Sequence, residues 1–136
     1  MREEKWLKLL LRLAGVMMLS MGAGLVVPMP WMAACHEWLG VGSLPDDAIV
    51  EYLARGMFGL SAMVGLILLA VSGEVRRYGP VIAIISAGCI ALGVVLWSFM
   101  GAGKGTYGLY ATIDGAVAIA LFAPILALQA RMNRPH

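Results

Sequence analysis

The chain has 136 residues, of which 61% are hydrophobic and only 13% are charged, and its formal net charge is +2. Soluble domains carry about a quarter charged residues, so this composition excludes an ordinary soluble domain and indicates an integral membrane protein. We expect one membrane domain over residues 1–136, surrounded by the lipid bilayer, with no nucleic-acid partner.

The first membrane span is predicted over residues 7–28, where an apolar run follows a basic start. A basic start before an apolar run is also typical of a signal peptide, and the stretch 32–35 (MAAC) resembles a lipoprotein cleavage box. We expect the segment to be retained, because Pro28, Pro30 and Trp31 separate the apolar run from the cysteine.

Residues 30–40 are too few to cross a bilayer, and they have the pattern of a short amphipathic helix. One side carries residues at helical spacing: Trp31, Ala34, Cys35 and Trp38. His36 and Glu37 fall on the other side. This pattern predicts a helix in the membrane interface, anchored by tryptophan.

The second span is predicted over residues 49–71, after a turn at 43–47 that ends in Asp46 and Asp47. An aspartate in this position caps a helix and complements the positive end of its dipole. Pro80 is typical of a first helical turn and precedes a third span, predicted over 81–100. A fourth span is predicted over 108–130 and contains Pro124, so the expected fold is an all-α bundle of four transmembrane helices.

The basic residues predict how the chain is inserted. Eight of the ten Lys and Arg residues fall at one end of the predicted spans: Arg2, Lys5, Lys8, Arg12, Arg76, Arg77, Arg131 and Arg134. Cytoplasmic loops carry an excess of such residues, so both termini are expected in the cytoplasm of a multi-pass inner-membrane protein.

Three ionisable residues are predicted inside the spans, where a charge is energetically expensive. Glu51 and Arg55 are four residues apart in the second span and can form a pair on one helix, and Asp114 lies in the fourth span. We expect a structural ion pair in which Arg55 also reaches Asp114. The alternative is an ion or proton site.

The outer loop carries further polar candidates: His36, Glu37, Asp46 and Asp47. Four soft or nitrogen ligands, which Cu(I) favours, fall in the same region: Met29, Met32, Cys35 and His36. Methionines on an apolar face are usually packing residues, so we expect no bound metal. No other cofactor and no catalytic residues are expected, because no nucleophile and base converge. The loop 101–108 lacks the spacing of a phosphate-binding loop.

Two segments of the chain carry a resemblance. Residues 27–60 contain HEWLGVGSLPD and VEYLAR, and residues 74–82 contain VRRYGP. They resemble small four-span bacterial inner-membrane proteins that share an HxWLGxGxxPD, VEYLxR and VRRYxP pattern. The resemblance implies four spans and this motif and no activity. The small multidrug transporters are also short four-span proteins, but they depend on an acid in the first span, and residues 7–28 contain none.

These patterns predict a non-enzymatic membrane protein that acts through a polar outer face, as a structural, accessory or binding protein. A homo-oligomer or a membrane-protein partner is possible within this hypothesis. The alternative function is a small oligomeric transporter or channel that uses Glu51, Arg55 and Asp114.

Overall fold

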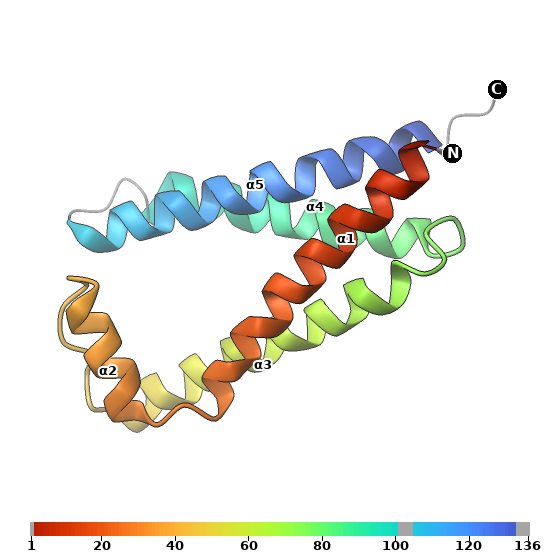
Figure 1. The fold of residues 1–136 in the computed structure, drawn as a ribbon. Helices are drawn as coiled ribbons and strands as arrows, with labels where there is room; N and C mark the ends of the chain where they lie inside the picture. Colours follow the sequence, from red (N-terminus) through yellow and green to blue (C-terminus); the bar gives the residue numbers. More distant parts are fainter. Residues whose placement is uncertain (1, 101–104, 133–136) are drawn as a thin grey trace. The chain divides into compact units, whose positions relative to one another are not determined.

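The computed structural model describes residues 2–100 and 105–132, which are helical apart from short connections and contain no strand. The helices follow one another in this order (Figure 1): α1 (Arg2–Ser20), a 3₁₀ helix η1 (Met21–Leu25), α2 (Met29–Trp38), α3 (Ala48–Val71), α4 (Gly79–Val95), a π-helical turn η2 (Leu96–Met100) and α5 (Thr106–Met132). In this described part, 4 helices are long and apolar enough to cross a membrane. The predicted all-α, four-span fold class is confirmed.

The first span differs most from its predicted range of 7–28. Helix α1 begins at Arg2, where Glu3 and Glu4 in the first turn complement the positive end of the helix dipole. Helical structure then tightens into η1 and ends at Leu25. The helix does not continue past this point, because Pro28 has extended backbone angles (φ −60°, ψ 141°) and caps the start of the next helix, α2.

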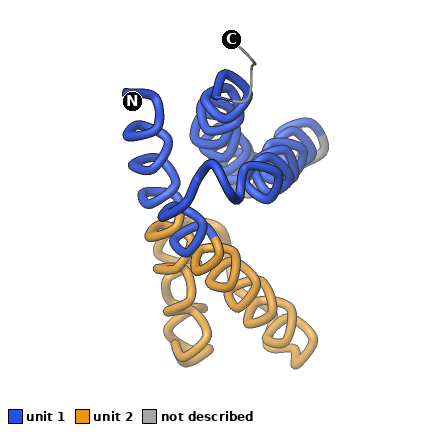
Figure 2. Tube along the Cα trace, turned by 90° about the vertical axis from the view of Figure 1, so that its right-hand side faces the viewer, with its two compact units in different colours: residues 1–14, 68–136 blue, residues 15–67 orange. Residues whose placement is uncertain are grey.

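The chain divides into two compact units, which Figure 2 colours separately. Unit 1 comprises residues 1–14 and 68–136, and unit 2 comprises residues 15–67. Helices α1 and α3 each contribute residues to both units. The single membrane domain stays a prediction.

Unit 1 has a fully buried apolar core. Helix α1 contributes Leu7, Leu11 and Ala14, which lie on one face because they are four and three residues apart. The other helical segments contribute buried side chains of similar kind: Leu68, Val71, Ile82, Phe122 and Ile125. Helices α4 and α5 run side by side in this unit (Figure 1).

Glycines set the closest contact between α4 and α5. A Cβ atom on Gly115 would lie 2.6 Å from the carbonyl oxygen of Gly93, and one on Gly93 would lie 2.9 Å from the carbonyl oxygen of Gly115. Real Cβ atoms do not approach a backbone oxygen so closely, so only glycine fits at either position. Gly93 and Gly115 therefore serve packing within the chain, whereas Gly88 on α4 has no atom within 4 Å of its Cβ position.

Unit 2 is held together by a similar contact between the end of the first span and α3. A Cβ on Gly65 would lie 2.5 Å from the backbone nitrogen of Leu19 and 2.7 Å from the carbonyl oxygen of Gly15. Farther along, Gly22 faces the Cβ of Ala62. These small side chains let the backbones of the two helices approach each other closely.

We predict that Gly65→Ala lowers the free energy of unfolding in mild detergent by about 1–3 kcal/mol, because the added methyl group overlaps backbone atoms that cannot move independently. Gly56→Ala is the matched control in the same helix, since no described atom lies within 4 Å of its Cβ position. That control is expected to be neutral or slightly stabilising, because alanine favours a helix more than glycine does. Equal losses for both variants would contradict the close approach at Gly65.

Candidate functional site

The first polar cluster lies in unit 2 and centres on Arg55. Its guanidinium donates from Nε to Glu51 Oε1 at 2.8 Å, and its Nη2 lies 2.6 Å from the same oxygen. Its Nη1 donates to the carbonyl oxygen of Leu25. The three groups, called the Arg55 cluster below, therefore consist of one cation, one carboxylate and one backbone carbonyl.

The position of Leu25 explains why the arginine reaches it. Leu25 is the last residue of η1, and the carbonyls at a helix end lack partners within the helix. They also carry the negative end of the helix dipole, which favours a nearby cation. Arg55 extends from α3 and so binds α3 to the end of the first span while Glu51 neutralises its charge.

The structure thus brings together two of the three residues predicted inside the spans. Glu51 and Arg55 pair along one helix, as their spacing indicates. Asp114 is exposed on α5 and belongs to unit 1, whereas Arg55 belongs to unit 2, so their pairing stays a prediction. Sequence reasoning missed the Leu25 carbonyl. The contact could have been anticipated in part, because two consecutive spans run antiparallel and the end of the first therefore lies near the start of the second.

The polar candidates of the loop that the sequence predicts to lie outside have different surroundings. Asp47 caps α3, because its Oδ1 accepts a hydrogen bond of 2.9 Å from the backbone nitrogen of Ile49. Asp46 is exposed at the rim of a shallow groove of about 270 Å³ that Pro30 and Leu44 also line. Asp47 therefore stabilises the start of α3, while the side chain of Asp46 is exposed on the surface.

The remaining candidates of this region lie on α2. Glu37 is exposed, and His36 is half-buried with an Nδ1 that makes no hydrogen bond within the described chain. Cys35 is an exposed free thiol. The ligand set proposed as the Cu(I) alternative thus falls on one short helix: Met29, Met32, Cys35 and His36. The structure gives no contact between any two of these four side chains, so the copper hypothesis stays untested. The residues described contain no group of three His, Cys, Asp or Glu side chains that could hold a metal.

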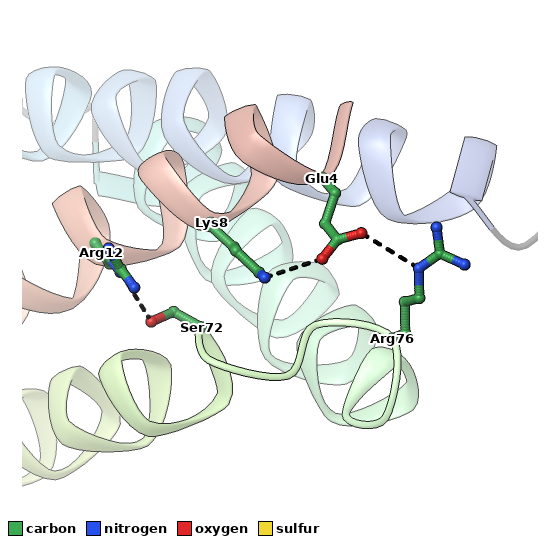
Figure 3. A network of polar contacts seen from close by, with 5 residues as sticks. All are labelled: Glu4, Lys8, Arg12, Ser72 and Arg76. Atoms are coloured by element: carbon green, nitrogen blue, oxygen red, sulfur yellow. Dashed lines mark hydrogen bonds and ion pairs between the residues drawn. The ribbon is translucent and has the colours of Figure 1, made fainter. Parts of the chain in front are cut away.

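A second polar cluster lies in unit 1 and is drawn in Figure 3. Glu4 on α1 accepts from Lys8 at 2.9 Å, and its other oxygen lies 3.3 Å from Nε of Arg76, in the connection between α3 and α4. One turn farther into α1, Arg12 Nε donates to Ser72 Oγ at 3.5 Å. Ser72 is itself 3% exposed and donates to the carbonyl oxygen of Leu69 at 2.7 Å.

These contacts, called the Glu4 cluster below, join the start of α1 to the segment after α3. The sequence indicated that basic residues gather at one end of the predicted spans. It did not indicate this pairing, because Glu4 and Arg76 are 72 residues apart. Within the basic connection, Arg77 pairs with Glu74 at 3.3 Å and lies over the ring of Tyr78, 5.4 Å from its centre. Residues 101–104 of the loop compared with a phosphate-binding loop lie outside the described part.

Comparison with known proteins adds no assignment to either cluster. No protein-family model matches the chain, and neither a curated protein nor a solved structure does.

We predict that Arg55 and Glu51 couple energetically, and double-mutant cycles in mild detergent measure this. Arg55→Leu and Glu51→Leu each leave the opposite charge without its partner. The double variant should therefore lose less free energy of unfolding than the sum of the two single losses, by about 1 kcal/mol. Arg55→Lys is the matched control, because lysine keeps the charge but lacks the fork that reaches Glu51 and Leu25 together. Additive losses would contradict the pairing.

The same measurement tests the predicted partner in α5. A cycle of Arg55→Leu with Asp114→Leu yields coupling of similar size if the two residues pair, and additive losses would end that hypothesis.

Proposed function

We propose that this chain is a bacterial inner-membrane protein with both termini in the cytoplasm, and that it acts as a non-catalytic accessory or binding protein. The observation that carries the proposal is the Arg55 cluster. The arginine inside the second span has its donors engaged by Glu51 and by the carbonyl of Leu25. Its charge therefore serves the fold rather than a substrate.

The energetics of a charge in lipid support this interpretation. An arginine near the centre of a membrane helix costs about 2.5–3.5 kcal/mol on insertion scales, and less near the interface. A carboxylate and a helix-end carbonyl offset that cost, because both attract the cation. A guanidinium held by two such groups is unsuited to bind and release an ion during transport, since each cycle would break both contacts.

The Glu4 cluster supports the proposed orientation. The ion pair between Glu4 and Arg76 brings the start of α1 and the connection after α3 to the same end of unit 1. Both segments are rich in basic residues, and the positive-inside rule assigns such an end to the cytoplasm. The motif shared with small four-span bacterial proteins is consistent with that insertion.

We place the binding surface for a partner on the proposed outer face, which includes α2. On α2, Trp31 is 72% exposed and Trp38 is 84% exposed. Exposed tryptophans on one short helix with an exposed carboxylate, that of Glu37, are typical either of a protein interface or of the lipid headgroup region. A second copy of the chain or another membrane protein would fit there.

We expect a photo-crosslinking amino acid at position 38 to give a discrete adduct with a membrane protein in intact cells. Trp38 is suitable because its side chain makes few contacts within the chain. Leu92 on α4 is 59% exposed on an apolar helix and is the control position, where lipid rather than protein should surround the probe. Immunoblotting measures the adducts. Equal adducts at both positions, or none at position 38, would contradict a binding role of the outer face.

The alternative is a small oligomeric transporter or channel. One observation favours it, because Asp114 is an exposed acid within an apolar helix, and acids in such positions commonly mark ion or proton paths. A second copy would be needed, since four short helices rarely enclose a pathway of their own.

We predict that the purified protein in liposomes gives no proton flux above that of empty vesicles, because Glu51 is paired with Arg55 and the remaining acid, Asp114, is not by itself a chain of proton-relaying groups. A pH-sensitive dye inside the vesicles measures the flux under an imposed gradient. Asp114→Asn should leave the background unchanged. A flux that the unaltered protein supports and Asp114→Asn abolishes would establish the transporter instead.

A further inference from the structure

The first half of α1 has two opposite faces. Leu7 and Leu11 are 0% exposed and form part of the core of unit 1. Trp6, Leu9 and Leu13 are 52%, 45% and 55% exposed and lie on the opposite side of the helix. In a protein with four apolar helices, this outward apolar strip is suited to contact lipid chains.

Two basic side chains lie at the end of this strip. Arg2 and Lys5 are three residues apart on the same side of α1, and with Trp6 and Leu9 they line a shallow groove of about 320 Å³. The lining of the groove is almost entirely apolar, so Arg2 and Lys5 contribute mainly the aliphatic stems of their side chains, as long basic residues commonly do. We call it the α1 groove, and its lining residues are Arg2, Lys5, Trp6 and Leu9.

Among the residues that the structure describes, no carboxylate pairs with Arg2 or Lys5. Glu4 is engaged by Lys8 and Arg76, on a different side of the helix. Glu3 is adjacent to Arg2 and two residues from Lys5, and side chains at those separations do not face each other on a helix. The two cations of the groove thus remain available to an external anion.

We propose that the α1 groove binds one anionic phospholipid, with its phosphate between Arg2 and Lys5 and an acyl chain along Trp6, Leu9 and Leu13. The dimensions agree with this placement. Arg2 and Leu9 are seven residues apart, which corresponds to about 10 Å along the helix axis. The headgroup layer on each side of a bilayer is about 5–8 Å thick, so the cations reach phosphate level while Leu9 reaches the acyl chains.

The apolar wall selects a lipid over a free phosphate ion. An inorganic phosphate would use only the two cations and leave Trp6 and Leu9 exposed. A phospholipid covers both parts, and tryptophan is enriched at this level of a membrane because its ring is apolar and its N–H is polar. A second shallow groove lies on α5, lined by Pro124, Ala127, Leu128 and Arg131, but it offers one cation only. It is therefore the weaker candidate.

The test is native mass spectrometry of the detergent-solubilised protein titrated with phosphatidylglycerol or with phosphatidylcholine. We expect one phosphatidylglycerol molecule to bind in preference to phosphatidylcholine. Arg2→Gln with Lys5→Gln should weaken that binding by about 30-fold, because each basic residue near a membrane surface contributes about a factor of five to the affinity for an anionic lipid. Circular dichroism verifies that the variant remains helical.

The matched control is Arg76→Gln with Arg77→Gln, which removes two exposed basic residues that line neither groove. This variant should keep the preference for phosphatidylglycerol. Equal loss in both double variants would mean a general effect of surface charge and would overturn the site. Displacement of the lipid by millimolar glycerol phosphate would instead assign the groove to a soluble phosphate ligand, and no preference between the two lipids would exclude any anion site.

Discussion

A membrane interior offers no water to hydrogen-bond a polar group, so each polar group in the apolar helices needs a partner from the chain. Arg55 meets this constraint through Glu51 and the carbonyl of Leu25. Ser72, which is almost fully buried directly after α3, likewise has partners in Leu69 and Arg12. In both cases the partner comes partly from a distant segment, and the polar group therefore links one helix to another. The few charges of this chain act as its most specific internal contacts.

Small residues make these contacts possible by bringing the helices close together. The first span lies so near α3 at Gly65 that backbone atoms of Gly15 and Leu19 occupy the space of a missing side chain. The two helices stay close enough for the end of η1 to reach Arg55, ten residues or about three helix turns from Gly65. Close helix packing and hydrogen bonding thus act together in holding the first span against α3.

Local features of the fold could be predicted from the sequence because their causes are local. Asp47 caps α3, and Pro80 falls in the first turn of α4, as their residue types indicate. The contact of Arg55 with Leu25 could not be predicted, because any residue has a backbone carbonyl and the sequence does not mark which one is unpaired. The pair of Glu4 and Arg76 was equally hidden, since 72 residues separate its members. The end of the first span was predicted too late, because hydropathy continues after Leu25 although the helix does not.

The basic residues of this chain differ in whether a carboxylate of the same chain lies close enough to pair with them. Arg55, Lys8 and Arg76 each have a carboxylate within ion-pair distance, so their charge is used within the chain. Arg2 and Lys5 have none among the described residues and lie beside an exposed apolar strip. An unpaired cation next to apolar surface is most stable where a phosphate and an acyl chain are both present, which is the edge of a bilayer. The same side-chain chemistry therefore fixes helices where an acid is near, and holds lipid where no acid competes.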